Sequence, residues 1–282
     1  MEKLDRRLHA FRPDLADVKL QGRVEAERFV EGRPARVVAP VSNIHAAPAF
    51  DAGVDSQLLH GEGVRVFDEA EGWSWIQAET DNYVGYVETA TLAQGATDLT
   101  HVVCAVRSFV YPQAELKSPP VDAHSMGARV KVVGQEEKRG TRYALLAGGG
   151  AMIADHLRPV DDHAPDYVEI AERFLHTPYL WGGRSGFGID CSGLVQLSMQ
   201  MAGRLCPRDT DMQASGLGEP IDQLQLRRGD LVFWKGHVAI VLDEQSIIHA
   251  NGHTMTVAVE PLEQAIERVA RLYDRPTGYR RA

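Results

Sequence analysis

Cysteine is scarce in this 282-residue sequence, and no run of apolar residues is long enough to cross a membrane. The three cysteines, Cys104, Cys191 and Cys206, are odd in number and show no C-x-x-C spacing. This pattern argues against a disulfide framework and against a structural zinc site. No stretch approaches the ~18 consecutive apolar residues that indicate a transmembrane helix, so we expect no membrane partner.

Basic residues are also fewer than acidic ones. The chain has 30 lysines and arginines against 39 aspartates and glutamates, a net charge of −9 and a pI near 5.7. Nucleic acid is therefore not expected as a partner. Residues 1–7 hold no apolar segment typical of a secretory signal. With the few cysteines, this favours a cytoplasmic protein, although a secreted chain trimmed of its signal peptide would have the same composition.

The length allows two or more domains, each with its own core. Residues 1–34 are polar with scattered apolar positions, and Pro13 separates two stretches with the pattern of short helices. We interpret them as a partly helical arm packed on the domains. The alternative is a plug or lid near the active site.

An internal repeat follows the arm. Residues 36–41 resemble residues 101–106 at an offset of 65, and residues 61–66 resemble residues 127–132 at an offset of 66. Both copies consist of short apolar strands separated by turn residues. Such units suit small β-barrels, which close a sheet on itself and leave no exposed edge. We therefore predict one barrel over residues 35–95 and a second over residues 96–160.

Residues 161–282 have a different pattern. A proline-bracketed linker over residues 158–165 precedes Asp166, a favoured helix N-cap. A first helix and a cysteine-bearing helix come next. The remaining predicted elements are strands near 231–235, 237–243, 246–250 and 256–259, a helix over 261–269 and a strand at 271–273. Helices followed by an antiparallel sheet indicate an α+β domain.

Cys191 stands at the start of the second helix. Asp190 is suited to cap its free N–H groups, and Gly203 is suited to end it. The positive end of the helix dipole favours a thiolate, so we expect the pKa of Cys191 to fall below the usual ~8.5. The helix is apolar on most sides and should be buried. Cys191 is thus a candidate nucleophile that needs a base.

Two histidines supply a base and its partner. His237 opens the strand at 237–243, and His249 closes the strand at 246–250. If these strands are antiparallel neighbours, both imidazoles come to one edge of the sheet. We predict that His237 exchanges a proton with Cys191 and that His249 orients His237.

Other residues of these types have simpler interpretations. Cysteine is among the most buried residue types, so Cys104 and Cys206 are interpreted as structural. His253 is the alternative to His249. Trp181 is expected to pack between its loop and the core.

Six blocks follow one another in an order that one known family shows. They are Tyr179-x-Trp181-Gly182-Gly183, Asp190-Cys191-Ser192-Gly193, Pro207-Arg208-Asp209-Thr210, Arg228-Gly229-Asp230-Leu231-Val232-Phe233, Gly236-His237-Val238-Ala239-Ile240 and Ile248-His249-Ala250. With these blocks, residues from about 166 to 282 resemble the NlpC-type cysteine peptidases of bacterial cell-wall metabolism. The resemblance implies a papain-like fold of helices plus an antiparallel sheet.

The resemblance also implies roles. Cys191 would be the nucleophile, His237 the base and His249 the orienting residue, while Tyr179 would help to stabilise the oxyanion. No metal or organic cofactor is implied.

Further positions would touch the substrate. The family's pattern gives this role to Asp190 and Ser192, and it places Asp209 near the substrate. The alternative for Asp209 is a structural ion pair with Arg208. Met212 and the neighbouring Asp211 are less typical in their block, so the resemblance defines that wall of the pocket less well.

The two predicted barrels resemble bacterial SH3-like domains, which often precede this type of peptidase. In relatives, a glutamate and a tyrosine of the first barrel grip the free amine of an L-alanine. Glu62 and Tyr83 stand at the matching positions, and their counterparts in the second repeat are Ala128 and the glycines at 148–150. An ammonium removed from water needs a carboxylate. The alternative is that Glu62 is an exposed turn residue and Tyr83 fills the barrel rim.

These resemblances imply a cysteine endopeptidase of murein peptides. It would cleave the bond between γ-D-glutamate and meso-diaminopimelate or lysine, in peptides with a free L-Ala, as in cell-wall peptide recycling. The alternatives are a catalytically inactive cell-wall-binding protein and a related thiol amidase or acyltransferase.

Overall fold

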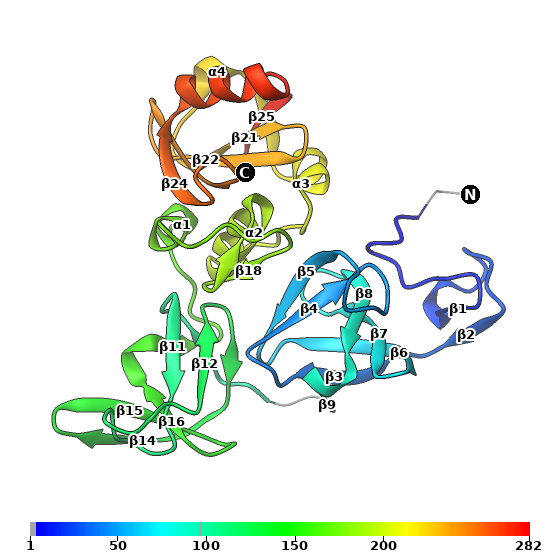
Figure 1. Ribbon diagram of the computed structural model, residues 1–282, viewed down its shortest axis with the longest axis vertical. Helices are drawn as coiled ribbons and strands as arrows, with labels where there is room; N and C mark the ends of the chain where they lie inside the picture. The colour runs from blue at the N-terminus through cyan, green and yellow to red at the C-terminus, as the bar shows by residue number, and fades with distance from the viewer. Residues whose placement is uncertain (1–3, 96–97) are drawn as a thin grey trace. The chain divides into compact units, whose positions relative to one another are not determined.

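The computed structural model describes residues 4–95 and 98–282 (Figure 1). The chain divides into two compact units, Met1–Asp161 and Asp162–Ala282. The division falls one residue after the boundary expected from the sequence. Within the described residues, no helix is both long enough and apolar enough to cross a lipid bilayer.

The N-terminal arm packs on the first set of strands. Its regular elements are β1 (Leu15–Asp17), the 3₁₀ helix η1 (Val18–Leu20) and β2 (Arg28–Val30), with β1 and β2 parallel. Arg12 binds Asp68 at 2.7 Å and lies over the Trp75 ring, and Leu15 joins Phe67 and Trp75 in one buried cluster. Apart from η1, the short helices expected in residues 4–34 are absent, because these residues form turns, bends and short strands.

Residues 33–94 form a seven-stranded antiparallel sheet with the strand order β5-β4-β8-β7-β6-β3-β9. Its elements are β3 (Arg33–Val37), β4 (Val41–His45), β5 (Val54–Leu59), β6 (Gly63–Ala70), β7 (Trp73–Ala78), β8 (Val84–Glu88), η2 (Thr89–Thr91) and β9 (Leu92–Gln94). Apolar side chains of these strands, with Tyr83, make one buried cluster. This core explains why the alternating apolar pattern predicted strands here.

Residues 101–159 repeat this order of elements. They are β10 (His101–Val103), β11 (Arg107–Val110), β12 (Asp122–Ser125), β13 (Arg129–Val130), β14 (Val132–Lys138), β15 (Thr141–Leu146), β16 (Ala151–Ile153), η3 (Ala154–His156) and β17 (Leu157–Pro159). The strand pairings correspond, since β10 pairs with β13 and β17 as β3 pairs with β6 and β9. The strands β14, β15 and β16 likewise pair in order, as β6, β7 and β8 do.

Backbone hydrogen bonds fix the alignment of the two repeats. Val37 N–H donates to Glu62 O at 2.9 Å, and Val103 N–H donates to Ala128 O at 2.8 Å. Ala128 is therefore the counterpart of Glu62, as predicted. The first strands, however, align at an offset of 66 and not 65, because Val37 corresponds to Val103. Consecutive valines in both strands fit either offset, so the sequence pattern could not decide between them.

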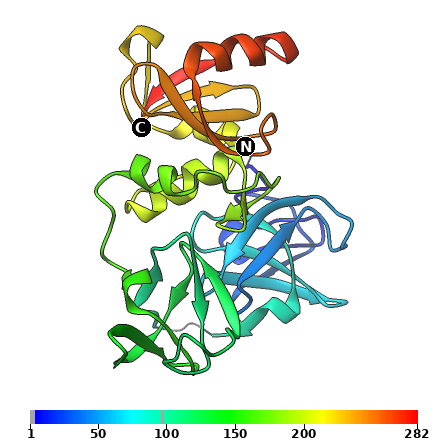
Figure 2. The ribbon, with the colours of Figure 1, turned by 60° about the vertical axis from the view of Figure 1, so that its left-hand side comes forward.

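The C-terminal unit is a sheet with helices on both faces. The sheet order is β20-β25-β21-β22-β23-β24, and its pairs are antiparallel. In Figures 1 and 2, α4 lies on one face and α2 on the other. The elements are α1 (Tyr167–Arg173), β18 (Arg184–Ser185), β19 (Gly188–Ile189), α2 (Cys191–Met201), α3 (Thr210–Gly216), β20 (Glu219–Ile221), η4 (Gln223–Gln225), β21 (Asp230–Trp234), β22 (His237–Val241), β23 (Ser246–Asn251), β24 (Thr256–Pro261), α4 (Leu262–Leu272) and β25 (Gly278–Arg281).

This arrangement confirms the α+β prediction but corrects its last element. The strand expected at 271–273 is wrong, because α4 continues to Leu272. The true last strand, β25, lies beside the central strand β21. Arg281 of β25 binds the buried carboxylate of Asp230, in β21, at 2.9 Å. That long-range ion pair had no local signal in the sequence.

Candidate active site

Cys191 occupies the first turn of α2, as predicted. The Asp190 carboxylate caps the helix by accepting a hydrogen bond from the Gly193 N–H at 2.7 Å. The helix packs against β22, and the backbone N–H of Val238 donates to the Cys191 sulfur. Thr210 Oγ1 lies 3.9 Å from the same sulfur. The nucleophile candidate is therefore fixed beside the start of the strand that carries His237.

Burial dominates the electrostatics of Cys191. It raises the pKa of the thiol to about 11, and the neighbouring charge of Asp190 acts in the same direction. Hydrogen bonds from Val238 and Thr210 and the charge of Arg208 oppose this rise without cancelling it. The expected lowering of the pKa is wrong for the free protein, because loss of hydration outweighs the helix dipole. The thiol is protonated near neutral pH.

His237 and His249 meet at the edge of the sheet. Strands β22 and β23 are antiparallel, and His237 Nε2 lies 2.9 Å from His249 Nδ1. Burial lowers the pKa of His237 to about 3, and the positive charge of Arg268 adds to the effect, as does His249 whenever it is protonated. Both the Cys191 thiol and the His237 imidazole are thus neutral in the free protein, and a neutral imidazole can act as a base.

The histidine pair continues into a third strand and a helix. His249 Nε2 lies 3.1 Å from Glu260 Oε2, and Arg268 binds both oxygens of Glu260 at 2.9 and 2.6 Å. Burial acts to raise the pKa of Glu260, but these hydrogen bonds overcome it and bring the pKa to about 2. Sequence reasoning missed both residues. The only signal was register: His249 pairs with Ala258, so Glu260 lies on the same face of the sheet two residues on.

Asp190 and Ser192 belong to a buried network around Arg208. Arg208, which is 1% exposed, binds the two Asp190 oxygens at 3.0 and 2.7 Å and Ser192 Oγ at 2.8 Å. Gly182 N–H also donates to Asp190, at 3.0 Å. Arg208 thus forms a buried ion pair with Asp190. Asp209 takes the N-cap position of α3.

Tyr179 lies close enough to Cys191 for a charge on the sulfur to affect the pKa of its phenol. Burial and the charges of Cys191 and Asp190 raise the pKa of Tyr179 to about 12. Its phenol therefore stays a hydrogen-bond donor at neutral pH. Tyr179, Trp181 and His237 all border a cavity of about 540 Å³. Trp181 is 72% exposed, so the expected packing of its ring into the core is wrong.

Comparison with known proteins agrees with this geometry. Residues 176–270 match the NlpC/P60 family, and residues 44–92 match the bacterial dipeptidyl-peptidase Sh3 domain. The C-terminal unit is an NlpC/P60 domain. It therefore belongs to a family of cysteine peptidases, and an SH3-like domain precedes it.

Individual relatives show how far the similarity extends. The chain is 28% identical to dipeptidyl-peptidase 6 of Lysinibacillus sphaericus, over 81% of this chain and 91% of the relative. It is 36% identical to the gamma-D-glutamyl-L-lysine dipeptidyl-peptidase of Bacillus cereus, over 35% of this chain but only 32% of that relative. The crystal structure of an NlpC/P60 family protein from Bacillus cereus has the same fold. Its TM-score is 0.73 at 20% identity, over 88% of this chain and 99% of the other.

Glu62 and Tyr83 lie in the other unit, within the SH3-like domain. Glu62 is 3% exposed and accepts a hydrogen bond from the Leu59 N–H at 2.8 Å. Thr80 Oγ1 donates to its other oxygen at 3.4 Å. Tyr83 is part of the buried barrel cluster. The alternative of an exposed Glu62 is therefore wrong, whereas the alternative of Tyr83 as a packing residue fits its burial.

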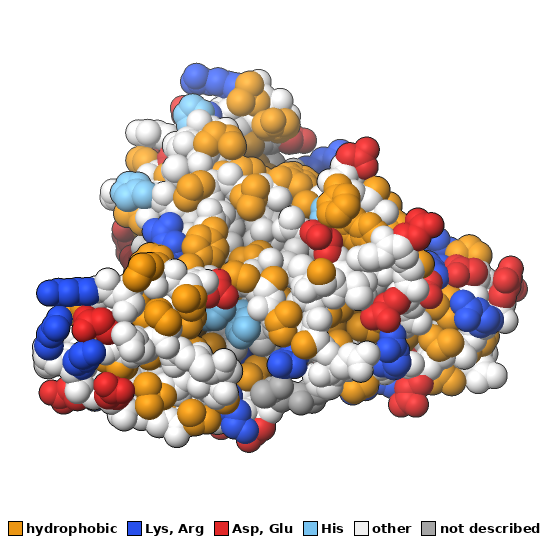
Figure 3. Space-filling view, turned by 60° about the horizontal axis from the view of Figure 1, so that its bottom comes forward, with side chains coloured by type: hydrophobic (Ala, Val, Ile, Leu, Met, Phe, Trp, Pro, Cys, Tyr) orange, Lys and Arg blue, Asp and Glu red, His pale blue; other side chains and the backbone are white. Residues whose placement is uncertain are grey.

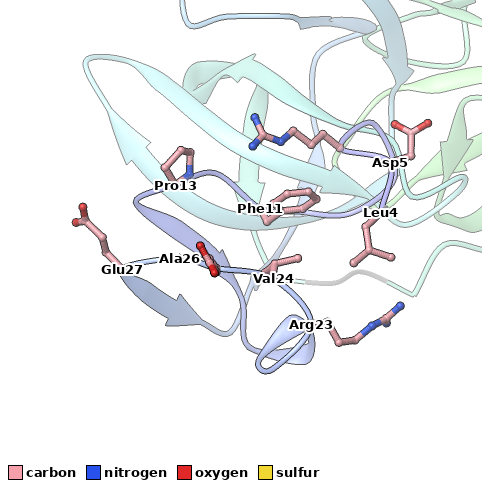
Figure 4. Close-up of a pocket in the computed structure, with 10 residues that line it drawn as sticks. Leu4, Asp5, Phe11, Pro13, Arg23, Val24, Ala26 and Glu27 are labelled. Carbon is pink, nitrogen blue, oxygen red and sulfur yellow. The ribbon is translucent and has the colours of Figure 1, made fainter. Parts of the chain in front are cut away.

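A cavity of about 1070 Å³ lies in the N-terminal arm, bordered by residues such as Phe11, Pro13 and Val24 (Figure 4). It is lined by none of the predicted site residues.

Within residues 4–95 and 98–282, no three histidine, cysteine or acidic side chains are grouped as a metal site requires. On the face in Figure 3, acidic and basic side chains are interspersed.

Proposed function

We propose that this protein is a cysteine endopeptidase that hydrolyses the bond between γ-D-glutamate and a diamino acid in murein peptides. The observation that carries the proposal is the site itself. Cys191 lies at the start of α2 against Val238, and the adjacent His237 is paired with His249 at 2.9 Å. A nucleophile, a base and an orienting group in this order perform acyl transfer.

The chemistry follows from these positions. As the Cys191 sulfur attacks the γ-amide carbonyl, its proton passes to His237. Backbone N–H groups at the start of α2 and the Tyr179 hydroxyl stabilise the oxyanion. His237 then gives the proton to the leaving amine of the diamino acid, and the amide bond breaks. Water, deprotonated by His237, hydrolyses the remaining thioester and restores the thiol.

The names of the relatives support the substrate class. Two of them are dipeptidyl-peptidases, and one name specifies a γ-D-glutamyl-L-lysine bond. A dipeptidyl-peptidase releases two residues from a free N-terminus, which fits an L-Ala-γ-D-Glu product. The third residue of the substrate is lysine or meso-diaminopimelate.

Glu62 and Tyr83 are proposed to select the free amine. Only the first repeat carries this pair, since Ala128 and Gly150 take the corresponding backbone positions in the second. The buried Glu62 carboxylate offers the negative charge that a desolvated ammonium needs. Residues 96–160 are proposed to be a second SH3-like barrel because their strands pair in the same order as those of the first.

Selection of a free L-Ala would direct the enzyme to released peptides. In intact wall the L-Ala amine is acylated, so it offers no ammonium. We therefore propose a role in the recycling of wall peptides, in the cytoplasm.

Mass spectrometry of two peptides tests the proposal. L-Ala-γ-D-Glu-meso-diaminopimelate and its N-acetylated copy are incubated with the protein, with Cys191→Ala as control. Cleavage of the free peptide alone supports both the bond and the amine selection. Cleavage of both peptides overturns the amine selection, and cleavage of neither by protein with a reduced Cys191 overturns the activity.

A further inference from the structure

The histidine pair is the middle of a longer row of polar groups. His237 on β22, His249 on β23 and Glu260 on β24 are joined by contacts of 2.9 and 3.1 Å. Arg268 on α4 ends the row with two hydrogen bonds to Glu260. Each of the three strands thus contributes one side chain to a single line at the edge of the sheet.

Hydrogen-bond roles along this row follow from Glu260. An ionised carboxylate only accepts hydrogen bonds, so His249 Nε2 must carry the proton. In neutral His249, Nδ1 is then an acceptor, and it can only accept from His237 Nε2–H. Neutral His237 is left with an unprotonated Nδ1. That nitrogen is the only one on its ring that can take a proton from Cys191.

We propose that Glu260 is a positioning residue of this peptidase, which sets the tautomers of His249 and His237 and stabilises the imidazolium that forms when Cys191 attacks. The word peptidase in this proposal rests on the proposed function. The proton transfer from the Cys191 thiol to His237 does not depend on which substrate the enzyme cleaves. Arg268 holds the carboxylate in place, and its own positive charge opposes the imidazolium. The titratable and charged groups that act on the pKa of His237 are His249, Arg268 and Glu260, and Cys191 lies against Val238, the next residue of β22.

The competing explanation is that Glu260 and Arg268 form an ordinary ion pair between β24 and α4. Their side chains are 18% and 23% exposed, and they contact each other at 2.6 Å. If so, removing Glu260 or removing Arg268 would change the reactivity of Cys191 in the same direction. A positioning role predicts consequences of opposite sign, because Glu260 raises the basicity of His237 and Arg268 lowers it.

The test is the rate at which iodoacetamide alkylates Cys191, measured by mass spectrometry from pH 5 to pH 11. This reaction needs the thiolate but no substrate, so it does not depend on the peptide specificity. The variants are Glu260→Gln, which keeps the shape without the charge, Glu260→Asp, which keeps the charge, and Arg268→Met. Glu263→Gln is the matched control, because Glu263 is an exposed carboxylate in the first turn of α4.

At neutral pH, we expect Glu260→Gln to slow alkylation about tenfold, which corresponds to one pKa unit of His237. Arg268→Met should match or exceed the original rate, Glu260→Asp should recover part of it, and Glu263→Gln should leave it unchanged. The difference between Glu260→Gln and the original protein should shrink as the pH approaches the raised pKa of Cys191, where the thiol ionises without His237.

Equal slowing by Glu260→Gln and Arg268→Met would overturn the proposal, as would a deficit of the same size at every pH. Circular dichroism of each variant separates these results from unfolding, which would speed alkylation and not slow it. If alkylation behaves as expected but no murein peptide is cleaved, the positioning role stands and the proposed function fails.

Discussion

Arg208 makes a bidentate ion pair with Asp190, the residue directly before Cys191, in a buried part of the NlpC/P60 domain. The same carboxylate caps α2 and accepts a hydrogen bond from Gly182. The Asp190 oxygens therefore hold together the loop at Gly182, the first turn of α2 and the segment before α3. Because both oxygens are engaged by the protein, we expect Asp190 to act mainly by fixing the position of Cys191.

This network predicts a large loss of stability in Arg208→Met. The variant leaves a buried carboxylate without its counter-charge, which should reduce the free energy of unfolding by about 3–5 kcal/mol. The matched control is Arg228→Met, which breaks exposed ion pairs with Asp166 and Glu172 and should cost at most about 1 kcal/mol. Urea denaturation measures both. Equal losses of unfolding free energy in the two variants would show that the buried Arg208–Asp190 pair stabilises the fold no more than the exposed pairs do.

Tyr179→Phe tests the oxyanion role. Loss of one oxyanion donor should lower kcat about 100-fold with little change in KM, because the hydrogen bond strengthens only in the transition state. Tyr273→Phe is the control, since Tyr273 borders the same cavity but is 84% exposed. Steady-state kinetics on the free peptide decide the question. A rise in KM with unchanged kcat would instead place Tyr179 in substrate binding.

Acid should destabilise the protein in a defined pH range. Burial lowers the pKa of His237 to about 3 and that of His124 to about 4, so both are neutral in the folded state. The unfolded chain binds these protons below about pH 6.5, so stability falls as the pH drops from there towards the folded-state values.

A His124→Asn variant should lose less stability on acidification than the original protein. His124 is buried against His60, and among the residues that the structure describes its Nδ1 has no hydrogen-bond partner. The exposed His253 supplies the control variant, His253→Asn, which should keep the original pH dependence. Thermal unfolding between pH 4 and pH 8 measures the effect. An unchanged slope in His124→Asn would contradict it.

Amine selection predicts a specific change in Glu62→Gln. Loss of the carboxylate should raise KM for the free peptide. The N-acetylated peptide should remain uncleaved or be cleaved slightly faster than by the original protein. Glu79→Gln is the control, because Glu79 is an exposed carboxylate of the same SH3-like domain that pairs with Arg65. If Glu62→Gln and Glu79→Gln have the same kinetics, Glu62 has only its structural role in accepting the Leu59 hydrogen bond.

Local signals were enough to predict the core of the site. Asp190 caps the helix of Cys191 because capping depends on neighbours within three residues. His237 and His249 meet because consecutive strands pair as a hairpin. The local pattern therefore predicted that Cys191 begins a helix and that His237 and His249 lie together.

The rest of the site depends on distant contacts that leave no local pattern. Arg208 binds a carboxylate 18 residues away, and Glu260 reaches His249 only through the register of β23 and β24. The pKa of Cys191 was predicted in the wrong direction for the same reason. Burial depends on how α2 packs against the sheet, and this outweighed the local effect of the helix dipole.

The most direct test of the account is to trap the acyl-enzyme. The protein is mixed with excess L-Ala-γ-D-Glu-meso-diaminopimelate, quenched with acid within the first turnover and digested for mass spectrometry. The account predicts that the peptide containing Cys191 gains the mass of an L-Ala-γ-D-Glu acyl group, and that Cys191→Ala neither gains this mass nor releases product. Hydrolysis that continues in Cys191→Ala, or an acyl group on any other residue, would contradict the assignment of Cys191 as the nucleophile.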